Sequence, residues 1–448
     1  MNPTLRRVLL STRGVDRTIY GASWGKVASP VLTRTDASVG MVANAGVDMQ
    51  VVRNDFDNTP LFGGIRDVTD SYGNVFVRIP KCYIRKTDGA SLSWQVSLFP
   101  WPGFYLPSCF WDFTNNRELP HVDIGKYKAS IGAGSRLESK PDVFPLVNTN
   151  IVDMRTFARN NNIGGLLGYQ QLDVHVVDLL QALFYVMFGT LNSQSIMQGF
   201  TTGQYNALHV ATATEAGANR IVVANAHANL FRVGQPISIG TFLGGNQIAI
   251  NRGITAINVV DGANRAIVFD GAAVNIATGN IVYNSAWRNG FSANITARNG
   301  SLVSNTDGLR PCVFLGIESL WGDCWQFVDG VNINERQAWV ARNAADYTSN
   351  VFAAPYEQLS YINHAVDGYV TAMGYDANRP FAALPTAVGG GSTTHYSDFY
   401  YQMTGQRVAL VGGYWITGAA SGLSVWALSY SSSNAGLTLV GRLVKKPL

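Results

Sequence analysis

Charged residues are scarce in this chain. Lys, Arg, Asp and Glu make up 14% of its 448 residues, whereas an average soluble protein has about a quarter. The net charge is only +4, and the positive residues are scattered apart from the pairs Arg6-Arg7 and Lys445-Lys446. A nucleic-acid-binding protein would carry a clustered basic surface. The composition therefore argues against a nucleic-acid partner.

Cysteine is also rare, with four residues at Cys82, Cys109, Cys312 and Cys324. No two of them form a CxxC pair, and their spacing does not match a zinc site. The six histidines show no ligand spacing either, so we predict neither a metal nor a cofactor. We expect buried, reduced thiols. A Cys312–Cys324 disulfide remains the alternative, and assembly in the cytoplasm would disfavour it.

Long hydrophobic runs are absent. The most apolar one, Leu179–Leu191, is too short to cross a bilayer and ends in polar residues. Met1–Arg17 carries four arginines around a short apolar run, which does not resemble a signal peptide. We therefore expect neither secretion nor membrane insertion. Such a protein, if adhesive, fits a virion component that is assembled in the host cytoplasm and released by lysis.

Glycine and aromatic residues, by contrast, are abundant. The chain has 46 Gly, 10 Trp, 19 Tyr and 21 Phe. A disordered chain would lack the aromatics. Low charge together with these residues is typical of a β- and loop-rich extracellular or virion protein.

Composition and turn signals divide the chain into four parts. Residues 1–69 mix short apolar runs with Gly, Asn and Ser, and we assign them to attachment or oligomerisation. Residues 70–202 carry hairpin patterns and then helices. Short β segments separated by Asp-Gly turns fill 203–285, which predicts a small inserted β domain. Residues 286–448 complete the main domain.

Two helices are predicted before the insert. Asp153 is placed to cap a short helix over Met154–Asn161, and Asp173 to cap a longer one. The longer helix is apolar over most of its surface, which indicates burial against a sheet. His175 and Asp178 lie on it three residues apart, and we expect them at a solvated edge rather than in a metal or catalytic pair. Helices together with these strands predict an α+β fold.

Leu315–Gly330 is dense in aromatics and is predicted to form the centre of the fold. We expect Trp321, Trp325 and Phe327 to be buried, because each such ring removes a large apolar area from water. Phe99–Phe113 is a second aromatic stretch. We expect its rings to pack on the core, with a sugar-stacking surface as the alternative.

The segment between Arg407 and Arg442 contains no charged residue. It is rich in Tyr, Ser, Gly and Asn, the residues that antibody binding loops favour. We predict a receptor-binding face here, with an ordinary uncharged loop surface as the alternative. The predicted contact residues are Tyr414, Thr417, Ser421, Ser424, Trp426, Ser429, Tyr430, Ser431, Ser432, Ser433 and Asn434. Trp415 is expected to be a buried framework residue.

The order of motifs resembles a known family. Gly322–Phe327 (GDCWQF), Arg407–Trp415 (RVALVGGYW) and Gly441-Arg442 are similar to the GNVWEW, RVxRGGSW and GFR pattern of the C-type-lectin-like fold of the formylglycine-generating-enzyme type. Phe76–Tyr83 (FVRIPKCY) and Ile124–Ala129 (IGKYKA) resemble segments of phage members of this fold. These include tail-fibre proteins and trimeric adhesins of the major-tropism-determinant type.

The resemblance implies a C-type-lectin-like domain with an inserted β domain in a phage tail fibre or receptor-binding protein. It implies attachment of the virion to a host receptor, either a protein or a glycan. It further implies a homotrimer, and contacts with other tail proteins through the N-terminal region. A structural tail or baseplate component and a polysaccharide-degrading tail enzyme remain the alternatives.

Catalytic residues of related families are not carried over. No cysteine follows Cys324, so the copper site of the formylglycine-generating enzymes is missing. The calcium-binding motifs of the sugar-binding lectins are missing too. Paired acids such as Glu318 and Asp323, or Asp367 and Asp376, are weak candidates for glycoside hydrolysis without a known geometry. We therefore expect a binding protein and not an enzyme.

Overall fold

The computed structural model describes residues 14–448. Strand residues make up 37% of the structure and helical residues 11%. The fold is therefore mostly β, and the predicted α+β class, with its C-type-lectin-like assignment, is wrong. The cause lies in the proportions of the elements. Both predicted helices form, but almost all other regular structure is strand, and α4 (Asn225–Ala228), the third α-helix in residues 14–448, is a single turn.

The largest sheet is built almost wholly from the C-terminal part of the chain. Its order is β24-β23-β22-β28-β29-β27-β25-β26, and β30 pairs with β22. These strands are β22 (Trp325–Asn334), β23 (Gln337–Val340), β24 (Glu357–Ile362), β25 (Gly368–Met373), β26 (Pro385–Val388), β27 (Phe399–Gln402), β28 (Gln406–Gly412), β29 (Gly422–Tyr430) and β30 (Leu439–Val440). We call it the main sheet.

Successive residues of the main sheet point to opposite faces, as strand geometry requires. Ala409 and Val411 of β28 belong to the largest hydrophobic core, whereas Val408 and Leu410 belong to a second core on the other face. Trp426 of β29 faces the first core and Ala427 the second. The main sheet therefore has two apolar faces, and each requires a covering layer.

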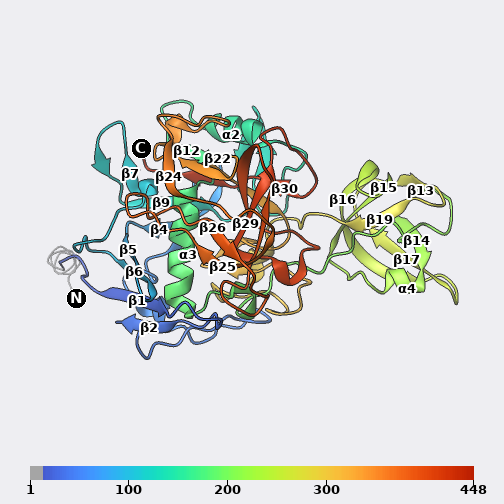
Figure 1. Ribbon diagram of the computed structural model, residues 1–448. Coiled ribbons are helices and arrows are strands. Elements are labelled where there is room, and N and C mark those ends of the chain that lie inside the picture. The colour runs from blue at the N-terminus through green and yellow to red at the C-terminus, as the bar shows by residue number, and fades with distance from the viewer. Residues whose placement is uncertain (1–13) are drawn as a thin grey trace, which may run out of the picture.

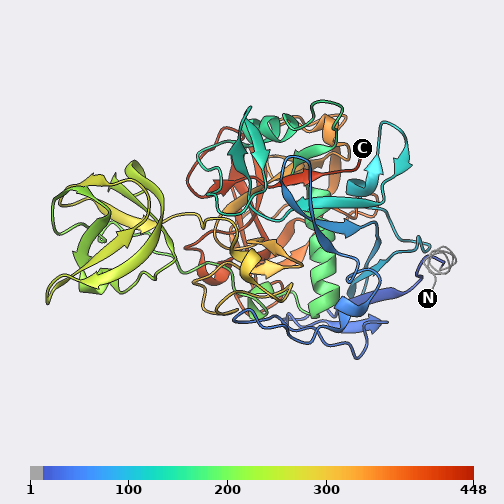
Figure 2. The ribbon, with the colours of Figure 1, turned by 180° about the vertical axis from the view of Figure 1, so that it is seen from behind.

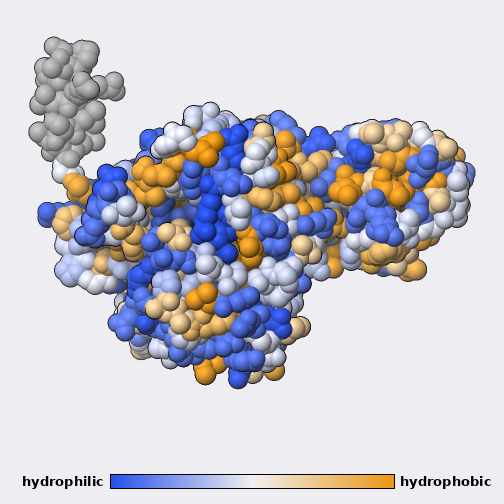
Figure 3. Space-filling model, turned by 90° about the horizontal axis from the view of Figure 1, so that it is seen from above, coloured by the Kyte–Doolittle hydropathy of each residue, from blue (hydrophilic) through white to orange (hydrophobic). Residues whose placement is uncertain are grey.

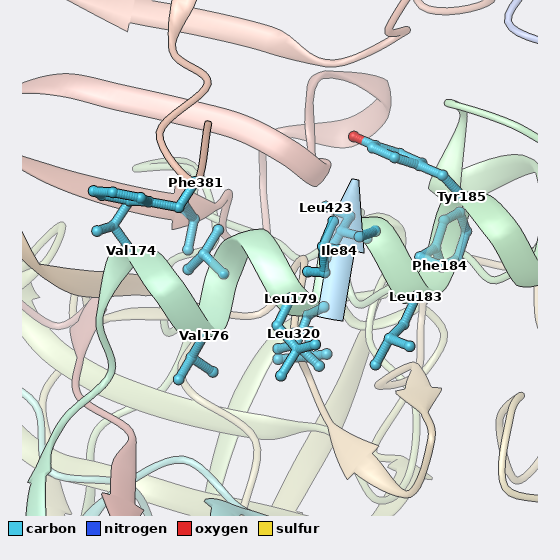
Figure 4. Packing of buried hydrophobic residues seen from close by; sticks show 14 of the residues in the cluster. Ile84, Val174, Val176, Leu179, Leu183, Phe184, Tyr185, Leu320, Phe381 and Leu423 are labelled. Atoms are coloured by element: carbon cyan, nitrogen blue, oxygen red, sulfur yellow. The ribbon is translucent and has the colours of Figure 1, made fainter. Parts of the chain in front are cut away.

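Helix α3 (Val174–Phe188) covers the first face, and all fifteen of its side chains are buried. Figure 4 shows its apolar residues against Ile84, Leu320 and Leu423. The Asp173 side chain accepts a hydrogen bond from the Val176 N–H at 3.0 Å, which confirms the predicted cap. Gly189 ends the helix with φ of +65°.

The predicted solvated edge of this helix is wrong. His175 and Asp178 are both buried, because α3 lies inside the main body with strands on more than one side of it (Figure 2). Asp178 forms an ion pair with Lys86 and accepts a hydrogen bond from the Tyr105 hydroxyl at 2.6 Å. The ring of His175 lies 4.2 Å from that of Phe381.

The other side of α3 is covered by N-terminal strands. A sheet of order β2-β1-β6-β5 contains β1 (Ile19–Trp24), β2 (Thr33–Asp36), β5 (Tyr83–Asp88) and β6 (Leu92–Ser97). Because β1 pairs with β6, the predicted boundary at residue 69 does not separate two units. Residues 1–13 of the predicted attachment region 1–69 lie outside the described residues.

Helix α2 (Ile151–Arg159) covers part of the second face of the main sheet. It begins at Asn150, whose side chain accepts a hydrogen bond from the Asp153 N–H at 3.0 Å, so Asp153 is not the cap that we predicted. Beside it lies a sheet of order β12-β31-β9-β4-β3. Its strands are β3 (Arg66–Thr69), β4 (Val75–Pro80), β9 (His121–Gly125), β12 (Tyr169–Gln171) and β31 (Leu443–Lys445).

Six short strands form three two-stranded ladders that close the loops of the main body. These are β7 (Trp111–Asp112) with β8 (Arg117–Glu118), β10 (Ser130–Gly132) with β11 (Arg136–Glu138), and β20 (Val313–Phe314) with β21 (Ile317–Glu318). The last ladder lies at the start of the Leu315–Gly330 segment.

A separate β lobe projects from the main body (Figures 1 and 3). Its sheet has the order β14-β17-β16-β15-β19, next to a β13-β18 pair. The strands are β13 (Glu215–Ala218), β14 (Arg220–Ala224), β15 (Pro236–Phe242), β16 (Gly245–Val259), β17 (Asn264–Phe269), β18 (Val274–Ile276) and β19 (Ile281–Asn284). The lobe has its own hydrophobic core. At its base, Tyr283 joins the cluster that contains Trp415 and Cys324.

Residues predicted to be buried are buried. Trp321, Trp325, Phe327 and Trp415 are at most 2% exposed, and the indole N–H of Trp321 donates to the Met197 carbonyl at 2.8 Å. The four cysteines are free and buried, which confirms the reduced-thiol prediction. Within residues 14–448, no helix has the length and apolarity needed to cross a bilayer.

Candidate functional site

The second face of the main sheet is only partly covered, and aromatic residues lie on the remainder. On β27, Tyr400 is fully buried in the first core, while Phe399 and Tyr401 on either side of it are half-buried on the opposite face. The neighbouring strand β25 places Tyr369 opposite Phe399. We call Tyr369, Phe399, Tyr401, Tyr414 and Tyr430 the aromatic row; all five are half-buried.

Ring contacts connect four members of the row, and Tyr430 packs beside them on the second core. The ring centroids of Tyr369 and Phe399 lie 5.0 Å apart, and those of Phe399 and Tyr401 lie 4.7 Å apart. Buried Trp325 joins the next two members, with centroids 5.6 Å from Tyr401 and 6.3 Å from Tyr414. Packing on the buried indole restricts the rotamers of Tyr401 and Tyr414.

The turn after β28 positions Tyr414. Gly412 and Gly413 have φ of +94° and +82°, a region that favours glycine. A Cβ on Gly412 would lie 2.7 Å from the Leu320 carbonyl oxygen, so this turn lies directly against the Leu315–Gly330 segment. The rings of Tyr414 and Trp415 lie 5.8 Å apart, and both contact the cluster at the base of the lobe, but they differ in burial. Trp415 is fully buried at the base of the lobe, and Tyr414 is half-buried.

The tyrosine hydroxyls of the row are available to a ligand. Those of Tyr401, Tyr414 and Tyr430 form no hydrogen bond with any part of residues 14–448. Burial, reinforced by nearby Tyr414, raises the pKa of Tyr401 to about 12. Burial and the adjacent Tyr414 likewise raise the pKa of Tyr430. At neutral pH each hydroxyl keeps its proton and can both donate and accept.

A polar loop continues the surface after β29. The Ser431 N–H donates to the Asn434 side-chain oxygen at 2.6 Å, and the hydroxyls of Ser431 and Ser433 lie 3.0 Å apart. Asn350 donates to the Ser432 hydroxyl at 3.1 Å from a neighbouring loop. Ser433 and Asn434 are exposed. These local bonds order the loop while leaving its outer polar groups in contact with water.

The structure divides the predicted contact residues into two groups. Those on the surface are half-buried or exposed: Tyr414, Thr417, Ser429, Tyr430, Ser431, Ser432, Ser433 and Asn434. Ser421, Ser424 and Trp426 are at most 1% exposed. Prediction of these three as contact residues is wrong, because no receptor can reach them.

Each of the three has an internal partner. The Ser424 hydroxyl is hydrogen-bonded to Tyr185 of α3, and its N–H donates to Asp398 at 2.6 Å. Ser421 bonds Thr417 through its hydroxyl. Trp426 packs in the first core. These residues therefore fasten β29 to the fold and do not bind a partner.

Three members of the row were missed from the sequence. Tyr369, Phe399 and Tyr401 lie outside the uncharged C-terminal segment from which the contact residues were predicted. The only available signal was the run Phe399-Tyr400-Tyr401, in which alternation along a strand puts the first and third rings on one face. Nothing in the sequence indicates which of the two faces is open.

Of the four acids considered for glycoside hydrolysis, Asp367 is exposed, whereas Glu318, Asp323 and Asp376 are buried. Glu318 and Asp323 are fully buried, so neither can reach a polysaccharide. The segment Gly21–Gly25 (GASWG) has the spacing of a serine nucleophile motif, but Ser23 lies inside β1, paired on both sides, and not on the strand-to-helix turn that the motif requires. Among residues 14–448, no three His, Cys, Asp or Glu side chains gather as a metal site.

The aromatic stretch Phe99–Phe113 contains both buried residues and residues that line a cleft. Cys109 and Phe110 are buried, as expected for packing on the core. Trp111 and Phe113, together with Arg159, line a cleft of about 410 Å³. This cleft is separate from the aromatic row.

The chain matches no protein-family model and no curated protein.

Proposed function

We propose that the protein is a phage tail-fibre or receptor-binding protein that attaches the virion to a host cell-surface receptor by noncovalent contact. The contact surface is the aromatic row together with the Ser431–Asn434 loop. One observation carries the proposal: an uncharged surface of half-buried tyrosines, edged by serine and asparagine, lies on the open part of a rigid sheet.

This surface has the properties that recognition requires. Tyrosine offers large contact area at a small conformational-entropy cost, and serine and asparagine provide adaptable hydrogen bonds. Because Trp325 and the second core hold the tyrosines from below, little rotamer freedom is lost on binding. A surface mounted on strands is also more accurately placed than one on mobile loops.

The proposal includes a homotrimer that contacts other tail proteins through its N-terminal region. Several copies of a weak site on one particle raise the effective concentration at the host surface, so that modest single-site affinity gives firm attachment. Catalysis forms no part of the proposal, since Glu318 and Asp323 are enclosed in the fold, and Asp376, the partner of exposed Asp367 in the other pair, is buried as well.

The test is binding of fluorescently labelled protein to cells of the bacterial host. The variants Tyr414→Lys, Tyr430→Glu and Ser432→Arg place bulky charges on the proposed surface. The folded fraction of each is expected to lose most binding, and the two tyrosine variants are also expected to melt at a lower temperature, because both tyrosines pack on the second core. Ala273→Glu adds a charge at an exposed position of the β lobe and serves as the control. Full binding by the three folded surface variants would refute the assignment of this face.

A further inference from the structure

We infer that the aromatic row binds an uncharged saccharide chain. The inference rests on the proposed function and names the chemical class of the receptor. It also adds Tyr369, Phe399 and Tyr401, which extend the contact surface from the C-terminal loop across β27 to β25.

The charge of the surface selects against an ionic ligand. Strands β25 and β27 carry no Lys, Arg, Asp or Glu, and neither does the segment from Val408 to Gly441 that holds Tyr414 and Tyr430. Exposed Asp367, directly before β25, contributes to the raised pKa of Tyr401, and this negative charge further disfavours an anionic ligand. An acidic polysaccharide or a phosphate group would need basic partners. A ligand without charge does not need such partners, so the absence of charged residues does not weaken its binding.

The spacing of the rings is similar to that of consecutive sugar rings. The centroids of Tyr369 and Phe399 lie 5.0 Å apart and those of Phe399 and Tyr401 lie 4.7 Å apart, about the length of one pyranose unit, with interplanar angles of 84° and 46°. The row therefore offers a mixture of ring faces and edges and not one flat platform. The C–H face of a pyranose is apolar and packs on an aromatic ring, because burying both surfaces removes apolar area from water. Half-buried rings retain one surface for this contact.

The polar groups of the surface complement sugar hydroxyls. A sugar hydroxyl both donates and accepts, and so do the protonated hydroxyls of Tyr401, Tyr414 and Tyr430, which have no partner within residues 14–448. Ser433 and Asn434 add exposed hydroxyl and amide groups at one end. The surface thus offers stacking and hydrogen bonding together, as an amphipathic ligand requires.

A protein receptor is the competing possibility, and chemical treatment of the host cells separates the two. Periodate opens sugar rings that carry adjacent hydroxyls and leaves the polypeptide backbone intact, whereas a protease removes surface proteins. We expect periodate treatment to abolish binding of the protein to host cells. Protease treatment should leave this binding unchanged. Loss of binding after protease alone would overturn the saccharide inference and leave receptor binding intact. Absence of binding to untreated cells would refute both.

A pair of adjacent tyrosines provides the matched variants. Tyr401→Ala removes a ring from the row and is expected to weaken binding about tenfold, the effect of about 1.4 kcal/mol of lost contact. Tyr400→Phe removes a hydroxyl that bonds the His364 carbonyl oxygen inside the fold, and is expected to bind like wild type. Tyr369→Ala tests a second position, and thermal melting reports whether each variant is folded.

Immobilised polysaccharides extracted from the host supply the direct probe. After separation by anion exchange, the neutral fraction should bind wild-type protein, and Tyr401→Ala should bind it about tenfold less tightly. Binding to the acidic fraction alone, or equal binding by Tyr401→Ala and wild type, would overturn the inference.

Discussion

Phe399 and Tyr401 project from the same face of β27, with ring centroids 4.7 Å apart, while Tyr400 between them is buried on the other face. This alternation follows from the twofold repeat of a strand. It puts two rings on the open part of the main sheet and uses the third to hold the strand on the core. Under the proposed function, recognition and stability thereby depend on adjacent residues.

The same division predicts different effects within the C-terminal segment. Trp426→Ala should lower the free energy of unfolding by about 3–5 kcal/mol, because it leaves a cavity in the core, while its folded fraction binds host cells normally. Asn434→Lys, at an exposed position, should weaken binding with a much smaller loss of stability, which comes from the hydrogen bond that its side chain accepts from the Ser431 N–H. Denaturant titration and cell-binding assays measure the two effects. A binding defect in folded Trp426→Ala would contradict the division.

Removal of one charge from a buried ion pair should be strongly destabilising. Lys128 and Asp323 are both fully buried and paired, and Asp323 also accepts a hydrogen bond from the Trp287 N–H at 3.0 Å. Lys128→Met leaves the carboxylate unpaired, and we expect a loss of about 3–5 kcal/mol in unfolding free energy. The double variant Lys128→Met/Asp323→Asn should be less destabilised. Equal unfolding free energies for Lys128→Met and wild type would show that the Lys128–Asp323 pair does not contribute to stability.

Burial of His175 should make the protein sensitive to acid. Loss of hydration lowers the pKa of His175 from 6.5 to about 4, so the folded state holds it neutral while the unfolded state binds a proton below pH 6.5. Stability should therefore fall as pH decreases from about 6.5 to about 4, by about 3 kcal/mol from this residue. His175→Gln should show a shallower decline over that range in chemical denaturation. Parallel pH profiles for the two proteins would be inconsistent with a neutral, buried histidine.

The glycine turn before Tyr414 should tolerate no side chain. Gly412 has φ of +94°, and its Cβ would contact the Leu320 carbonyl oxygen at 2.7 Å. Gly412→Ala should lower the unfolding free energy by at least about 1–3 kcal/mol, from backbone strain alone, and displace Tyr414. Gly262→Ala, in an open turn of the lobe with nothing near its Cβ, is the matched control. Similar melting temperatures for both variants would contradict this account of the turn.

The sequence was informative where a structural element depends on neighbours in the chain. The Asp173 cap and the apolar helix after it are local features, and both form as predicted. The dense aromatics at Trp321 and Trp325 are likewise buried. For the first helix, two residues of cap type lie three positions apart, and the sequence does not decide between Asn150 and Asp153.

The sequence was uninformative where burial depends on a distant partner. Asp178 is buried because Lys86, 92 residues earlier, pairs with it. Ser424 looked like a surface residue by type, yet its partner is Tyr185 on α3, 239 residues away. The prediction of the fold class was wrong for a related reason. Capping signals identify helices, whereas the share of strand is set by long-range pairing that leaves weak local patterns.

The most direct test of the central claim is inhibition of virion adsorption by the purified protein. Host cells are first saturated with wild-type protein or with the Tyr414→Lys variant, and the adsorption rate of added virions is then measured. If this surface carries the receptor contact, wild-type protein slows adsorption strongly and the variant does not. Unchanged adsorption to cells saturated with wild-type protein would contradict the claim that the aromatic row attaches the virion to its host.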